Sequence, residues 1–365
     1  MKYPPVHYHD YLGIEALLGT QKRRSQDFGK PAHDEMLFII VHQAYELWFK
    51  QVLFELDSVL EIFGTEKIEE KKMGRAVARL ERIRDIITHT IGQIDILETM
   101  TPMDFLDFRD YLYPASGFQS FQWRMIETKL GLPVDQRLAY SESPFWRSLH
   151  PSQQEAMKKI LSERSLFDGL ESWLERTPFL SQPNFDFWKS YEQSVVNLLN
   201  EDEQVVRKNP RLNEADKEKT IKGLEATKQT YLNLFDPEKY RELQASGAVR
   251  FSSKALQAAL FIMIYRDEPI LQLPYRLLAC LVDLDEKMTE WRYRHALMAQ
   301  RMLGKKIGTG GSSGHEYLKS ATEKHKIFAD LVNLASFMIP SSQIPELPEN
   351  IREQMNFFFR APKSS

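Results

Sequence analysis

Cysteine is almost absent from this sequence of 365 residues, which contains only Cys280. A single cysteine cannot form a disulfide within the chain, so a reducing compartment fits, and we expect the cytoplasm. The residues around it, RLLACLVDL, are mostly apolar. We therefore expect Cys280 to pack in the core and not to act as a nucleophile.

A strong charge of one sign and a long apolar run are also lacking. The net charge is −3, so no basic excess argues for a nucleic-acid partner. The longest apolar run, near residues 255–265, is too short to cross a bilayer. The first twelve residues have no apolar segment typical of a secretory signal. We therefore expect no membrane and no nucleic acid among the partners.

The common catalytic motifs are missing as well. The chain has no CxxC, HExxH, GxSxG or Walker motif. This excludes the usual signals of zinc sites, serine hydrolases and P-loop enzymes. No long stretch alternates between apolar and polar residues, so few strands are expected.

The pattern that is present has the period of an α-helix. Apolar residues recur every three to four positions in residues 37–55, 75–98, 153–176 and 184–200. Two faces of 37–55 are largely apolar, so we expect this helix to be buried on most sides. The sequence therefore predicts an all-α helical bundle.

Residues 201–234 differ from the rest because charged side chains dominate and Pro210 interrupts them. We interpret them as a small helical subdomain exposed to solvent. A mobile charged linker is the alternative. The predicted main domain then comprises residues 1–200 and 235–365.

Two of the nine histidines lie on apolar helical faces. His42 shares a face with Phe38, Tyr45 and Phe49. His295 lies on a stripe with Leu284, Met288, Trp291, Met298 and Met302. A lone histidine in such a place is more often a core residue with one hydrogen bond.

The pair of histidines also fits a haem, which needs one axial imidazole and an apolar cleft between helices. Zinc or non-haem iron would need three or more protein ligands. No cluster of such residues at ligand spacing accompanies His42 or His295.

Two more segments carry groups suited to a small polar ligand. Arg109 lies among aromatic residues, where its guanidinium could bind a carboxylate or pair with a neighbouring aspartate. Residues 304–314 contain five of the sixteen glycines. Thr309 and the backbone of this loop could bind an ammonium or a carboxylate, and a flexible linker is the alternative.

Together these segments resemble the tryptophan 2,3-dioxygenase family. The matching stretches occur in order from residue 8 to about residue 340: HDEMLFIIVHQAYELWFKQVLFELDSV, ETMTPMDFLDFRDYLYPASGFQSFQ, WLERTP, IYRDEP, WRYRHALMAQRMLG and IGTGGSSG. Val41 stands where animal members carry threonine, and this change removes no functional group named below.

The resemblance implies an oxidoreductase that inserts both atoms of O2 into the indole double bond of L-tryptophan. The product is N-formyl-L-kynurenine, the first step of kynurenine-type tryptophan catabolism. The resemblance also implies one haem b per subunit, with His295 as the axial iron ligand and His42 on the distal side. The substrate-pocket positions fall on Phe38, Phe105, Arg109 and Thr309, and the haem-cavity positions on Ser116 and Gly117.

The resemblance further implies a homotetramer built as a dimer of dimers. Residues 1–12 would then reach a neighbouring subunit and place Tyr8, Tyr11 and Leu12 at its substrate pocket. Within WLERTP, Trp173, Arg176 and Pro178 could form a second, non-catalytic tryptophan site, and an ordinary helix end is the alternative.

Two other classes of protein remain open at this point. A haem-based sensor or oxygen carrier would need the two histidines but neither Arg109 nor the glycine-rich loop. A helical interaction protein would have no cofactor, and both histidines would be core residues.

Overall fold

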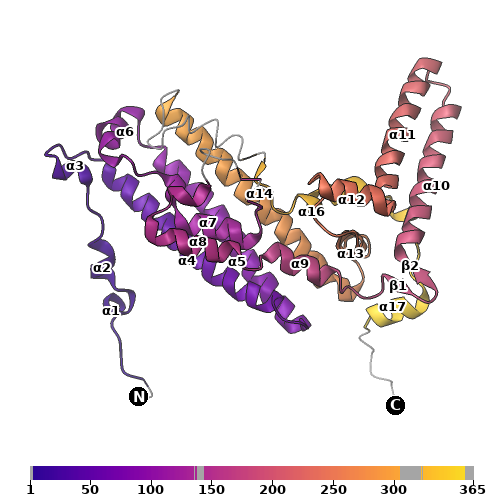
Figure 1. The fold of residues 1–365 in the computed structure, drawn as a ribbon, viewed down its shortest axis with the longest axis horizontal. Helices are drawn as coiled ribbons and strands as arrows, with labels where there is room; N and C mark the ends of the chain where they lie inside the picture. The colour runs from indigo at the N-terminus through magenta and orange to yellow at the C-terminus, as the bar shows by residue number, and fades with distance from the viewer. Residues whose placement is uncertain (1–2, 135, 138–143, 305–321, 323, 358–365) are drawn as a thin grey trace, which may run out of the picture. The chain divides into compact units, whose positions relative to one another are not determined.

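The computed structural model describes residues 3–134, 136–137, 144–304, 322 and 324–357 (Figure 1). These residues form helices and one small antiparallel sheet, in which β1 (Ser181–Gln182) pairs with β2 (Phe185–Asp186). The prediction of an all-α fold is therefore confirmed. No helix in this described part is long and apolar enough to cross a membrane.

The chain divides into two compact units. The first unit comprises Met1–Val59, Arg79–Ser165 and Leu284–Ile327, and the second comprises Leu60–Ala78, Leu166–Asp283 and Phe328–Ser365. The α-helices up to α8 are α1 (Tyr8–Leu12), α2 (Ile14–Leu18), α3 (Arg24–Asp27), α4 (Glu35–Phe63), α5 (Glu70–Leu97), α6 (Pro102–Arg109), α7 (Phe121–Leu130) and α8 (Pro151–Leu161). The later ones are α9 (Leu166–Leu174), α10 (Phe187–Lys208), α11 (Glu214–Phe235), α12 (Pro237–Ala245), α13 (Ser253–Ile264), α14 (Pro269–Leu303), α16 (Ala329–Asn333) and α17 (Glu349–Met355). Short 3-10 helices span Asp110–Leu112, Gly117–Gln119, Phe145–Ser148, Leu334–Phe337 and Ser341–Gln343.

Most of the predicted helices are present, with one exception. Residues 37–55 lie within α4, and the segments 75–98 and 184–200 correspond to α5 and to part of α10. The single helix predicted for 153–176 is wrong, because α8 ends at Leu161 and α9 begins at Leu166. The Ser162 hydroxyl donates to the Lys159 carbonyl at 2.7 Å and so competes with continued helix.

Helix α4 is less buried than its sequence predicts. Val52 and Leu56 are fully buried, as expected for a core face. Ile40, Leu47 and Phe54, which follow one another at intervals of seven residues, are 49%, 53% and 72% exposed. The prediction that this helix is buried on most sides is therefore wrong for this face.

The charged residues 201–234 are helical except for 209–213, which connect two helices. They occupy the end of α10 and most of α11, two helices that lie side by side (Figure 1). Asn213 caps α11 by accepting a hydrogen bond from the backbone N–H of Asp216 at 2.8 Å. The boundaries predicted for an inserted subdomain stay a prediction, since α10 already begins at Phe187.

Two helix caps fix the elements that lead to the site. Thr101 and Asp104 form a capping box at the start of α6, in which Asp104 accepts from the Thr101 backbone N–H at 2.9 Å. Ser120 caps α7 and accepts from the Trp123 N–H at 3.2 Å.

Cys280 is 2% exposed, so its predicted place in the core is confirmed.

Candidate active site

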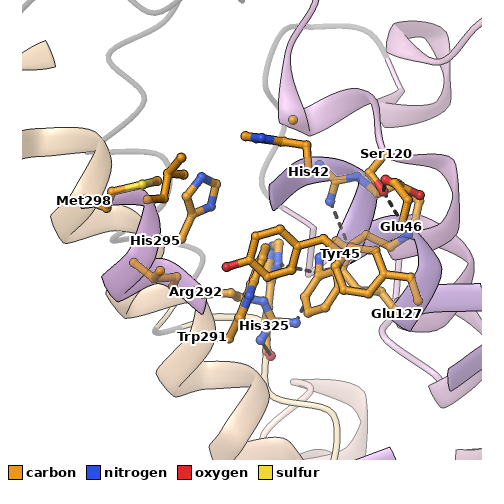
Figure 2. A pocket seen from close by; sticks show the side chains of 16 residues that line it. His42, Tyr45, Glu46, Ser120, Glu127, Trp291, Arg292, His295, Met298 and His325 are labelled. Atoms are coloured by element: carbon orange, nitrogen blue, oxygen red, sulfur yellow. Dashed lines mark hydrogen bonds and ion pairs between the residues drawn. The ribbon is translucent and has the colours of Figure 1, made fainter. Parts of the chain in front are cut away.

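Both singled-out histidines line one pocket of the first unit. His42 comes from α4 and His295 from α14, and their rings face one another across the pocket (Figure 2). The pocket measures about 910 Å³, counting the part open to solvent.

The hydrogen bonding of His42 assigns its tautomer. Its Nδ1 lies 2.7 Å from the Phe38 carbonyl oxygen, one turn earlier in α4. Because a carbonyl can only accept, Nδ1 carries the hydrogen and Nε2 keeps a lone pair. Burial lowers the pKa of His42, while the Phe38 carbonyl and the charge of Glu46 raise it by less. At neutral pH the ring is therefore a hydrogen-bond acceptor at Nε2.

His295 is a neutral imidazole with an unsatisfied nitrogen. Burial, and to a smaller extent the nearby His42, lower its pKa to about 4. Its Nδ1 is buried and has no hydrogen-bond partner within the described ranges. A buried polar atom without a partner is costly, and a metal ligand commonly orients its second nitrogen through a further partner. A buried, neutral imidazole with a nitrogen free of protein partners in the described part of the chain is compatible with a metal ligand.

The surroundings restrict the kind of metal. Across the described ranges, no group of three or more His, Cys, Asp or Glu side chains could hold a metal ion. An iron that needs only one protein ligand, because a tetrapyrrole supplies the rest, fits this single imidazole. The residues of the pocket therefore fit a haem.

Aromatic rings form the pocket wall next to His295. The Trp291 ring lies 5.3 Å from the His295 ring and 4.4 Å from the Trp123 ring, measured between centroids. Tyr45 meets Trp291 edge-on at 6.1 Å. Flat apolar surfaces of this kind suit a planar cofactor or an indole.

A buried ionic cluster connects α7 and α14 at the same pocket. The Glu127 carboxylate, 1% exposed, lies 3.0 Å from an Arg124 nitrogen, 3.1 Å from Arg292 and 3.7 Å from Arg137. Burial alone would raise the pKa of Glu127, but Arg124, a hydrogen bond from His325 and the other two arginines outweigh it and hold the pKa well below its usual range. His325, which stands in a polar stretch of the sequence, is 1% exposed.

Two of the residues predicted to shape the substrate pocket, Phe38 and Phe105, lie near His42. Phe38 packs 4.1 Å from the His42 ring and 5.9 Å from Phe105. Arg109 is the last residue of α6, directly after the fully buried Phe108. Phe38 on α4 and Phe105 on α6 thus lie near His42, whereas neither they nor Arg109 are among the residues that line the pocket.

The remaining predicted site residues are the haem-cavity positions, Thr309 and the N-terminal segment. Gly117 lines the pocket, and the Ser116 backbone N–H donates to the Gln119 side chain at 3.2 Å. Thr309 lies outside the described residues. Tyr8, Tyr11 and Leu12 form α1 and are 76%, 74% and 44% exposed, so their place at a neighbouring subunit stays a prediction.

Several pocket residues do not emerge from the sequence reasoning. They are Tyr45, Glu46, Trp123, Arg124, Glu127 and Arg292. Glu46 could have been predicted from the sequence, because it follows His42 by four residues and so lies on the same helical face. Glu127 and Arg292 are 165 residues apart in the chain, and no local pattern pairs them.

A second pocket lies in the other unit and contains the three residues of WLERTP that we singled out. Trp173, Arg176 and Pro178 line it, together with Phe179 and Ile262. The Arg176 Nε donates to the Ser172 carbonyl at 2.9 Å. That this pocket binds a second tryptophan stays a prediction, and equilibrium dialysis that counts L-tryptophan per haem would test it.

Comparison with known proteins gives a consistent result. A family model described as tryptophan 2,3-dioxygenase matches residues 3–338. The chain is 60% identical over 359 residues to a tryptophan 2,3-dioxygenase of Bdellovibrio bacteriovorus, covering 98% of this chain and 100% of that protein. It is 44% identical to the proteins of that name from Alteromonas mediterranea, over 98% of both chains, and from Dictyostelium discoideum, over 96% of this chain and 88% of the relative. The similarity spans every element that lines the pocket.

Proposed function

The chain belongs to the tryptophan 2,3-dioxygenase family and is an enzyme that oxidises L-tryptophan to N-formyl-L-kynurenine, and we propose that it does so with a haem bound between His42 and His295. The observation that supports this most is the buried His295 ring, whose Nδ1 has no partner in the described part of the chain. In the proposed enzyme each subunit binds one haem b, and the His295 imidazole is the ligand of its iron. We place the enzyme in the cytoplasm, in keeping with its single buried cysteine.

When bound, the haem supplies the redox chemistry that activates O2. The protein positions the indole and excludes water. Phe38 and Phe105 form a flat slot beside His42, and the Nε2 lone pair of His42 accepts a hydrogen bond from the indole N–H. Arg109 holds the carboxylate of L-tryptophan, and Thr309 and the haem-cavity residues Ser116 and Gly117 complete the site.

Two spectra test this function. Reconstitution with haem should give a Soret band, and the loaded protein should convert L-tryptophan into a product that absorbs in the near ultraviolet. The absence of a Soret band would favour a helical protein without a cofactor. Haem binding without turnover would favour a sensor or oxygen carrier.

His42→Ala should leave haem bound but slow turnover. A hydrogen bond lost in a dry site costs about 1–3 kcal/mol, which corresponds to roughly a ten- to hundredfold lower rate. Steady-state kinetics and the Soret band of the variant measure both effects. Loss of haem from His42→Ala would instead indicate that both histidines bind the iron.

Arg109→Lys should weaken L-tryptophan binding. Lysine keeps the charge but not the planar pair of donors that matches a carboxylate, and a charge-assisted hydrogen bond contributes about 1.5–3 kcal/mol. KM for L-tryptophan should therefore rise about tenfold or more. Tryptamine, which has no carboxylate, should be a poor substrate of the wild type, and equal turnover of both compounds would contradict the role of Arg109.

Deletion of residues 1–12 should weaken tryptophan binding without loss of haem. Tyr8 and Tyr11 are 76% and 74% exposed, and we propose that they close the pocket of a neighbour in a homotetramer, a dimer of dimers. Sedimentation and L-tryptophan titration measure assembly and binding. A fully active monomer of the intact chain would exclude this arrangement.

A further inference from the structure

Glu46 lies on α4 one turn after His42, and its carboxylate forms hydrogen bonds with residues at the start of α7. Glu46 lines the same pocket as His42 (Figure 2). Its Oε1 accepts from the Ser120 hydroxyl at 2.6 Å, and its Oε2 accepts from the Gln122 side-chain amide at 2.7 Å. The same amide donates to the Glu46 backbone carbonyl at 2.7 Å.

The Ser120 hydroxyl connects this carboxylate to the pocket wall. It donates to Glu46 and at the same time caps α7, which carries Trp123 into the wall. The Ser120 backbone N–H donates to the Gly117 carbonyl at 3.1 Å, so the turn that contains Gly117 is part of the same network. A continuous chain of hydrogen bonds thus joins the turn of α4 after His42 to the start of α7 and to Gly117, which also line the pocket.

The charge of Glu46 is not cancelled by these partners. Both are neutral groups, and no ion pair involves Glu46 in the part of the chain that the structure describes. A half-buried negative charge next to a neutral imidazole favours any positive charge that develops on the ring as it accepts a hydrogen bond. The network therefore has a geometric and an electrostatic effect on His42.

We propose that Glu46 is a positioning residue for His42: through Ser120 and Gln122 it fixes the distance from His42 to the Gly117 wall, and its charge strengthens His42 as an acceptor for the indole N–H. This inference rests on the proposed haem-dependent function. It adds a residue that acts through His42 and does not itself touch the substrate.

Two variants separate the two effects. Glu46→Gln keeps the shape and one acceptor oxygen but removes the charge. Ser120→Ala keeps the charge and removes the Ser120 hydrogen bond, so that only Gln122 still connects Glu46 to α7. Each should lower kcat about three- to tenfold, the effect of one ordinary hydrogen bond. In a His42→Ala background, Glu46→Gln should cause no further fall, because its effect passes through His42.

A spectroscopic measurement does not depend on turnover. In the ferrous carbon monoxide complex, the C–O stretching frequency responds to the polarity of the distal pocket. Glu46→Gln should shift this frequency. Glu61→Gln, at an exposed carboxylate on the same helix outside the pocket, should leave both the frequency and kcat unchanged.

The outcomes distinguish this inference from the function on which it rests. A wild type without a Soret band would overturn the function. If the wild type is active but Glu46→Gln keeps both kcat and the C–O frequency, the role of Glu46 is overturned and the function is not. The same holds if Glu46→Gln lowers kcat as much in the His42→Ala background as in the wild type. If Glu46→Gln does not fold, Glu46→Asp and Ser120→Ala, which both keep the charge, test the positioning effect through kcat and the C–O frequency, and unchanged values in both variants would overturn the role of Glu46.

Discussion

His295→Gly is expected to lose its haem and its activity, and added imidazole is expected to restore part of both. The variant removes the one imidazole that fits the iron, and the glycine leaves room for a free imidazole in its place. Mutation of a residue that only hydrogen-bonds a metal ligand already lowers the affinity for the metal about ten- to hundredfold. We therefore expect haem to dissociate about a hundredfold faster, or more, after loss of the ligand itself.

Haem transfer to an acceptor protein, followed in the Soret region, measures this rate. His89→Ala is the matched control, because His89 is an exposed histidine on α5 that contacts Trp48 and does not line the pocket. A His295→Gly variant with a normal Soret band and normal haem retention would exclude His295 as the ligand.

Glu127→Ala is expected to cause the largest loss of stability in the first unit. Three guanidinium groups share this one carboxylate at 3.0 to 3.7 Å, and all of them are buried. Removing one partner of a buried ion pair costs about 3–5 kcal/mol, because the remaining charge stays buried. Urea unfolding of wild type and variant measures the difference. Glu290→Ala, which breaks an exposed pair with Lys287 on α14, is the control and should change little.

The contribution of Glu127 depends on pH in a defined direction. The folded pKa of Glu127 is held below the ordinary value of 4.5, so its stabilising effect is fully present above that value and is lost as the pH falls through the lower, folded pKa. The unfolding free energies of wild type and Glu127→Ala should therefore converge in acid. A constant difference between pH 7 and strongly acidic pH would contradict the ionic origin of the effect.

The sequence predicts the two histidines of the site because each has a local signal. His42 and His295 interrupt apolar helical stripes, and a period of 3.6 residues is readable without any tertiary information. The all-α fold follows from the same period. The same spacing places Phe38 next to His42, whereas the prediction for Phe105 rests on the family resemblance.

What the sequence does not predict depends on contacts between distant residues. Glu127 and Arg292 approach only because α7 packs near α14, and His325 is buried although polar residues surround it in the chain. The break between α8 and α9 has no proline or glycine to mark it, so the sequence pattern does not reveal it. The exposed face of α4 contains the same residue types as its core face, so composition alone does not separate the two.

The single buried cysteine has a practical consequence. A thiol reagent that stays in water will not reach Cys280, so a cysteine introduced on the surface is the one that reacts. A fluorophore or spin label can then be attached at Tyr8→Cys with the native cysteine left in place. The mobility of that label, compared between dilute and concentrated protein, reports directly whether the N-terminal segment becomes covered when subunits associate.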